Sequence, residues 1–206
     1  MPLIDVPTIH AVTDPKVLSD PGFFSHAEAV FRTLGASGAV HLRAPGVSAS
    51  RLYAVSSYLR RLAAATGCRL VVNDRTDVAR ATGAWGVQLG QRSMVAADAR
   101  AAAPAAAIGV SVHSLAEATS GAEAGADWLV AGHIFATPSH SDVPGRGVDF
   151  IRSLRHLPVP IIAIGCVLPT HVRALLEAGA HGIAAIRGIW ESPDPGAAAR
   201  AYLQVS

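Results

Sequence analysis

The stretch Gly35-Ala36-Ser37-Gly38-Ala39-Val40-His41-Leu42 is a short turn followed at once by a run of mostly apolar residues. Similar phrases, in which Gly-Ala opens an apolar run, begin at Gly83, Gly125 and Gly179, so that the four copies start 48, 42 and 54 residues apart. A strand and the helix that returns the chain take about 25 residues together. Each interval therefore holds two strand-helix units.

Further apolar runs complete this pattern. They lie at 8–12, 69–73, 108–112 and 160–164, and helical segments such as 49–65, 115–124 and 169–178 separate the runs. Runs without polar interruption are typical of parallel strands that are buried on both faces. Eight alternating strands and helices predict a single (β/α)8 TIM-barrel domain over residues 1–206. An open, doubly wound sheet is the alternative architecture.

Composition excludes several classes of partner. The formal net charge is only +2, and the basic residues are spread along the chain, which argues against nucleic acid. No apolar run reaches the roughly 18 residues that a membrane span needs, and the N-terminus lacks the features of a secretory signal. Cys68 and Cys166 are far apart and are expected to be free thiols in a reducing compartment. We expect a cytoplasmic protein, either monomeric or homo-oligomeric, that binds a small molecule.

Polar residues end the predicted strands. Active sites of (β/α)8 barrels lie at the C-terminal ends of the strands, so these residues are the candidates for substrate binding. The set comprises Arg43, Asn73, Gln88, His113, His133 and Thr137. It suits an anionic heterocycle, and either His113 or His133 can transfer a proton near neutral pH. By contrast, His10, His41 and His181 fall within predicted strands, where we expect them to pack.

The last two predicted strands end in glycine-containing turns. Loops after strands seven and eight, together with a short extra helix, form the usual phosphate site of this fold, because backbone N–H groups can approach the oxygens there. The residues concerned are Gly165, Cys166, Ile186, Arg187 and Gly188, and Gly147 precedes a predicted helix at 148–155 that could add a further contact. The alternative is that these glycines only make tight turns.

Several motifs together resemble the thiamine phosphate synthase superfamily along nearly the whole chain. They are Val72-Asn73-Asp74-Arg75, Gly86-Val87-Gln88-Leu89-Gly90-Gln91, Gly109-Val110-Ser111-Val112-His113-Ser114 and Ala163-Ile164-Gly165. The synthase pattern has lysine where this chain has Pro45, a magnesium-binding acid where it has Ser93, and a further lysine in the loop after strand six. Displacement of diphosphate needs such charge neutralisation. The departures therefore predict a protein with no metal site and no cofactor.

Two phrases look more like the TenI-type thiazole tautomerase of the same superfamily, namely Ser111-Val112-His113-Ser114-Leu115 and Gly132-His133-Ile134-Phe135-Ala136-Thr137. The resemblance implies an isomerase that converts a thiazole carboxylate phosphate into its aromatic tautomer in thiamine biosynthesis. It implies that His113 is the acid/base, that Arg43 binds the carboxylate, and that Asn73, Gln88 and His133 hold the ring. Two alternatives stay open: a thiamine phosphate synthase, and a non-catalytic protein that senses a thiamine precursor.

Overall fold

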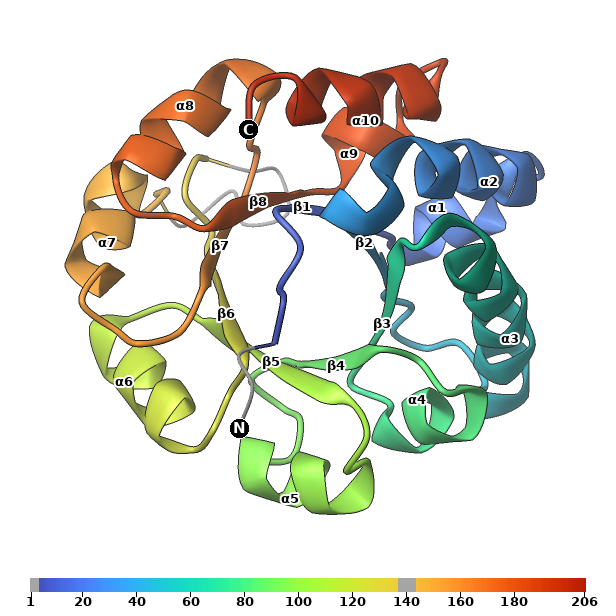
Figure 1. Ribbon diagram of the computed structural model, residues 1–206, viewed down its shortest axis with the longest axis horizontal. Coiled ribbons are helices and arrows are strands. Elements are labelled where there is room, and N and C mark those ends of the chain that lie inside the picture. The colour runs from blue at the N-terminus through green and yellow to red at the C-terminus, as the bar shows by residue number, and fades with distance from the viewer. Residues whose placement is uncertain (1–3, 137–143) are drawn as a thin grey trace.

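The computed structural model describes residues 4–136 and 144–206. Eight parallel strands close into a barrel in which each strand pairs with the next along the chain and β8 returns to β1 (Figure 1). The strands are β1 (Ile9–Val12), β2 (Gly38–Leu42), β3 (Arg69–Asn73), β4 (Gly86–Leu89), β5 (Ala107–Val112), β6 (Trp128–Ala131), β7 (Ile161–Ile164) and β8 (Gly182–Ala185). The predicted (β/α)8 barrel is confirmed. The first strand begins one residue later than the sequence pattern suggests.

Helices surround the barrel on its outside (Figure 1). They are α1 (Pro15–Ser19), α2 (Phe23–Leu34), the 3₁₀ turn η1 (Gly35–Ser37), α3 (Ala49–Thr66), α4 (Thr76–Thr82), α5 (Ala96–Ala102), α6 (Leu115–Glu123), α7 (Gly147–Leu154), α8 (Pro169–Glu177), α9 (Arg187–Trp190) and α10 (Pro195–Leu203). Within the described residues, no helix combines the length and the apolar character that crossing a membrane requires.

The sequence explains why these helices begin where they do and which side they bury. Asp14, Ser48 and Ser114 each accept a backbone N–H of the following helix on their side-chain oxygen, which satisfies a donor that the helix itself leaves unpaired. In α2, the buried residues recur at helical spacing, from Phe23 to Leu34. One face of each such helix therefore packs on the barrel while the other faces solvent.

Aromatic side chains fill the N-terminal half of the barrel. Trp128, at the start of β6, is fully buried, stacks on Trp85 with ring centroids 5.3 Å apart, and donates its Nε1–H to Gln88 Oε1 at 2.9 Å. Gly109 makes room for it, because a Cβ at that position would lie 2.1 Å from the Trp128 ring. This packing closes one end of the barrel, so that open space remains at the C-terminal ends of the strands.

Candidate functional site

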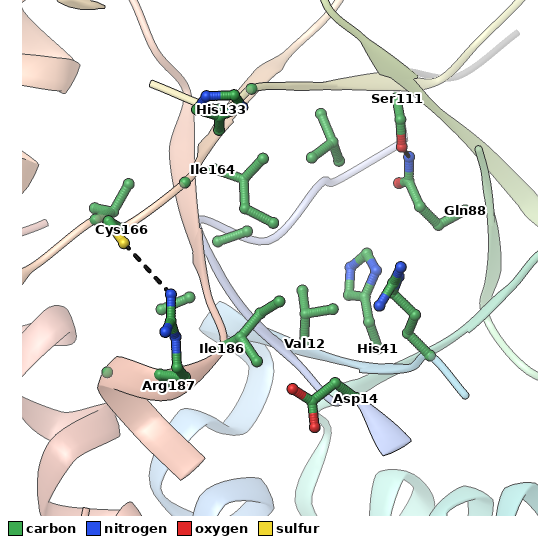
Figure 2. A pocket seen from close by; sticks show the side chains of 18 of the residues that line it. Val12, Asp14, His41, Gln88, Ser111, His133, Ile164, Cys166, Ile186 and Arg187 are labelled. Carbon is green, nitrogen blue, oxygen red and sulfur yellow. Dashed lines mark hydrogen bonds between the residues drawn. The ribbon is translucent and has the colours of Figure 1, made fainter. Parts of the chain in front are cut away.

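A cavity of about 720 Å³ opens at the C-terminal ends of the strands (Figure 2). The structure brings most of the predicted site residues together in its wall: Arg43, Asn73, Gln88, His113, His133, Gly165, Cys166, Ile186, Arg187 and Gly188. Gly147 is not in this wall, and its N–H donates to Ile134 O at 2.9 Å. Thr137 lies outside the described residues.

A second cavity, of about 650 Å³, adjoins the first and is lined by the loops that follow β2, β3 and β4. Arg43, Asn73, Ser111 and His113 line both cavities, so the two form one site with two lobes. The second lobe also contains Asp74, Arg75, Arg92 and Ser93. Sequence patterns did not indicate this lobe, although Arg75 and Arg92 follow strands three and four closely enough to have suggested it.

Arg43, which follows β2, is fixed at the junction of the lobes by the end of β1. The buried hydroxyl of Thr13 donates to Arg43 O at 3.1 Å and accepts from Arg43 N at 3.0 Å. The Thr13 N–H donates in turn to His41 O at 3.0 Å. These contacts hold the backbone of Arg43, and they leave its half-buried guanidinium to reach both lobes.

His41 is buried, in agreement with the expectation that it packs, and its side chain also lines the first cavity (Figure 2). Its Nε2 lies 2.8 Å from His10 Nδ1, and His10 Nε2 lies 2.9 Å from Pro7 O. Since a carbonyl oxygen can only accept, His10 must donate from Nε2, and its Nδ1 then accepts from His41 when both rings are neutral. His181, also expected in a strand, instead precedes β8 and contacts Val6 O through its Nε2.

Burial keeps these two histidines neutral. It lowers the pKa of His10 from its ordinary value of 6.5 to about 4, and burial with the neighbouring His10 lowers the pKa of His41 as well. The stability that the neutral His10 contributes is therefore complete above pH 6.5 and declines as the pH falls toward about 4.

We expect the free energy of unfolding to drop by about 2 kcal/mol between pH 8 and pH 5 through His10 alone. Urea titrations of the wild type and His10→Gln check this, and an equally steep decline in the variant would contradict it.

Gln88 has less freedom to bind a ligand than its position suggests. Its Oε1 accepts from Trp128 Nε1, and its Nε2 donates to Ser111 Oγ at 3.0 Å (Figure 2). Both ends of the amide are engaged within the protein, and the side chain is almost fully buried. Gln88 therefore forms the floor of the site and fixes the orientation of the Ser111 hydroxyl.

Asp74, which occupies a metal-ligand position of the resembled synthase, is engaged in a turn. Its Oδ1 accepts from Gly90 N at 3.0 Å and from the Ser93 hydroxyl, and its backbone has a positive φ of 61°. Ser93 thus stands as a hydrogen-bond donor where the synthase pattern has a second carboxylate. In the described ranges, no group of three or more His, Cys, Asp or Glu side chains is placed to hold a metal ion. Asp74 therefore stands in this turn without the second carboxylate of the synthase pattern.

The loops after β7 and β8 have tight backbone constraints. Gly165 and Cys166 adopt positive φ values of 114° and 47° in succession, and a Cβ on Gly165 would lie 2.5 Å from His133 Cβ. Arg187 NH2 lies 3.7 Å from Cys166 Sγ (Figure 2). Gly188 is also required by packing, because a Cβ there would lie 2.2 Å from the Tyr202 hydroxyl. A bulky residue at Gly188 would therefore disturb the fold as well as any phosphate contact.

The sequence matches the family described as thiamine monophosphate synthase over residues 9–189. It is 39% identical to the thiamine-phosphate synthase of Methanoregula boonei over 93% of this chain and 89% of that protein. It is 38% identical to the thiamine-phosphate synthase of Methanospirillum hungatei, over 94% and 95% of the two chains. Among solved structures, thiamine phosphate pyrophosphorylase from Pyrococcus furiosus superposes with a TM-score of 0.85 at 29% identity, over 96% of this chain and 94% of that one.

These relatives overturn the prediction of a TenI-type isomerase. Their names are those of synthases, which transfer a group between two substrates, and the synthase was the alternative that the sequence left open. The phrase around His113 therefore did not distinguish an isomerase from a synthase. The match covers nearly all of the barrel. The chain belongs to the thiamine monophosphate synthase family.

Proposed function

We propose that this protein is a transferase that joins a pyrimidinylmethyl diphosphate to the ring nitrogen of a thiazole phosphate and releases diphosphate. The observation that carries the proposal is the pair of adjoining cavities that share Arg43, Asn73, Ser111 and His113. An isomerase holds one substrate, whereas a condensation needs two substrates side by side with their reacting atoms at the junction. The names of the relatives support the same reaction class.

Charge suggests how the two substrates divide the site. The second lobe contains Arg75 and Arg92 together with the shared Arg43, and it suits the diphosphate. The first lobe ends at the loops after β7 and β8, where Gly165 and Arg187 suit the phosphate of the thiazole. With the phosphates anchored at opposite ends, the carbon that loses diphosphate and the nitrogen that attacks it meet beside His113 and Asn73.

Simultaneous binding tests this arrangement. A thiazole phosphate and a non-hydrolysable methylene analogue of the pyrimidine diphosphate should each bind with a stoichiometry of one, and neither should displace the other in calorimetric titrations. Saturation with one ligand should leave the affinity for the other unchanged or raise it. Mutual displacement would show that both ligands compete for one pocket, and it would contradict the proposal.

The turn at Asp74 leads to a prediction about magnesium. Because Ser93 holds the Asp74 carboxylate, we expect a chelator to lower the rate of the wild type by less than about twofold. Ser93→Asp, which supplies the second carboxylate, should be stimulated by magnesium more strongly than the wild type. The measurement is the initial rate with and without EDTA and magnesium. A wild-type rate that falls at least tenfold in EDTA and returns with magnesium would contradict the prediction.

A further inference from the structure

His113 follows β5 and is held by the first turn of α6. The Glu117 carboxylate accepts from His113 N at 2.7 Å, and its Oε2 lies 3.3 Å from His113 Nδ1. Gln91 Nε2 donates to the same carboxylate at 3.1 Å and to Ser111 O at 2.9 Å, while Arg146 Nε donates to His113 O at 2.6 Å. Both the backbone and the ring of His113 are therefore fixed, and Nε2 is the ring nitrogen left for the two lobes.

Among the described residues, some of the cations near the two lobes are already paired within the protein. Pro45 brings no charge where the resembled pattern has a lysine, and Lys16 forms an ion pair with Glu191 at 2.7 Å. Arg75 is similarly paired with Asp77. A leaving oxygen that gains negative charge in a partly enclosed site must be neutralised by a cation or by a proton. His113 lines both lobes and can supply a proton.

We infer that His113 protonates the departing diphosphate and that Glu117 is the positioning residue that holds its imidazole in the orientation for this transfer. The inference rests on the proposed function. In the step, the bond between the pyrimidinylmethyl carbon and the diphosphate oxygen breaks, and its electron pair stays on the oxygen. The Nε2 proton passes to the diphosphate, the thiazole nitrogen forms the new bond to the carbon, and His113 regains a proton from solvent.

Other charged groups face His113 from the neighbouring elements. They are Glu117 on α6, Arg146 before α7, Arg43 after β2, His133 after β6, Asp74 and Arg92 in the second lobe, and Asp14, Lys16, Cys166, Arg187 and Glu191 across the first. Glu117 is the carboxylate in hydrogen-bond contact with the His113 ring. Loss of the Glu117 carboxylate should therefore release the His113 ring from its fixed orientation.

A structural role for Glu117 must be separated from this one. Ser114 Oγ accepts from Glu117 N at 3.2 Å, and the Glu117 carboxylate reaches back to the residue before the cap, as in a capping box. Glu117→Gln keeps an acceptor of the same shape and removes only the charge. If Glu117 merely caps α6, this variant should have the activity of the wild type.

The experiment compares the wild type, His113→Gln, Glu117→Gln and the control Glu123→Gln, which removes a charge from the exposed end of α6. We expect kcat with the diphosphate substrate to fall about 100-fold in His113→Gln and about 10-fold in Glu117→Gln. In Glu117→Gln, KM should stay within about twofold of the wild type, so that the loss falls on kcat. All three variants should have the thermal unfolding midpoint of the wild type, and Glu123→Gln should also have its activity.

A second substrate separates the effect of proton transfer from the other effects of each substitution. Chloride leaves without needing one, so with pyrimidinylmethyl chloride His113→Gln should form product at a rate within about threefold of the wild type. Equal losses with both leaving groups, or wild-type kcat in both variants, would overturn the role of His113. If the wild type itself forms no product from the diphosphate, the proposed function fails instead.

Discussion

Arg43→Ala should lower kcat/KM for the pyrimidine diphosphate by about 100- to 1,000-fold. The Arg43 guanidinium is shared by the two lobes, and the Thr13 hydroxyl bonds both the N–H and the carbonyl oxygen of Arg43. A preorganised cation at the point where charge develops acts mainly on the transition state, so the loss should fall on kcat as well as on KM. The measurement is a steady-state rate series over both substrates.

Two variants control for this result. Arg43→Lys keeps the charge but loses the planar, two-pronged contact, so it should recover only part of the activity. Arg61→Ala removes an exposed arginine from α3 and should behave as the wild type. If Arg43→Ala retained more than a tenth of the wild-type kcat/KM, the diphosphate would not be bound at the shared junction.

Gly165→Ala should damage both the stability of the barrel and the binding of substrate. The backbone φ of 114° is one that only glycine adopts easily, and the added Cβ would lie 2.5 Å from His133 Cβ and 2.7 Å from Ile134 N. Strain and overpacking together should reduce the free energy of unfolding by about 3 kcal/mol. Displacement of the loop after β7 should also raise KM for the thiazole phosphate at least about tenfold.

Gly125→Ala is the matched control, because Gly125 has a φ of 84° but open space where the Cβ would lie. It should lose only about 1 kcal/mol and keep full activity. Urea unfolding and substrate saturation curves for both variants give the comparison. Equal destabilisation by the two changes would mean that the contact with His133 is unimportant, and an unchanged KM in Gly165→Ala would remove the loop after β7 from the phosphate site.

The fold was largely predictable because its signal is local and repeated. Each of the four Gly-Ala phrases combines a helix end with the start of a buried strand, and the eight strand-helix units that they imply leave few architectures open. The polar strand ends were predictable for the same reason, since parallel strands in a barrel present their C-terminal ends on one side. Arg43, Asn73 and His113 meet there for that reason alone.

The features that were not predicted depend on how separate loops and strands are placed relative to one another in the folded barrel. Arg75 and Arg92 belong to different loops, and only closure of the barrel brings them to one lobe. The position of His41 beside the cavity was not predicted, because a buried strand carries no sign of which side chains point inward. The prediction of an isomerase was wrong for the same reason. The sequence shows the departures at Pro45 and Ser93, but it does not show the second lobe.

The most direct measurement of the central claim is the product balance of the purified wild-type protein. Pyrimidinylmethyl diphosphate and thiazole phosphate are mixed with the protein in the presence of magnesium, and thiamine phosphate and diphosphate are quantified by chromatography with mass detection. Diphosphate displacement at a two-lobed site predicts that both products appear at equal rates and only when both substrates are present. Binding of both substrates without either product, or diphosphate release without thiamine phosphate, would contradict it.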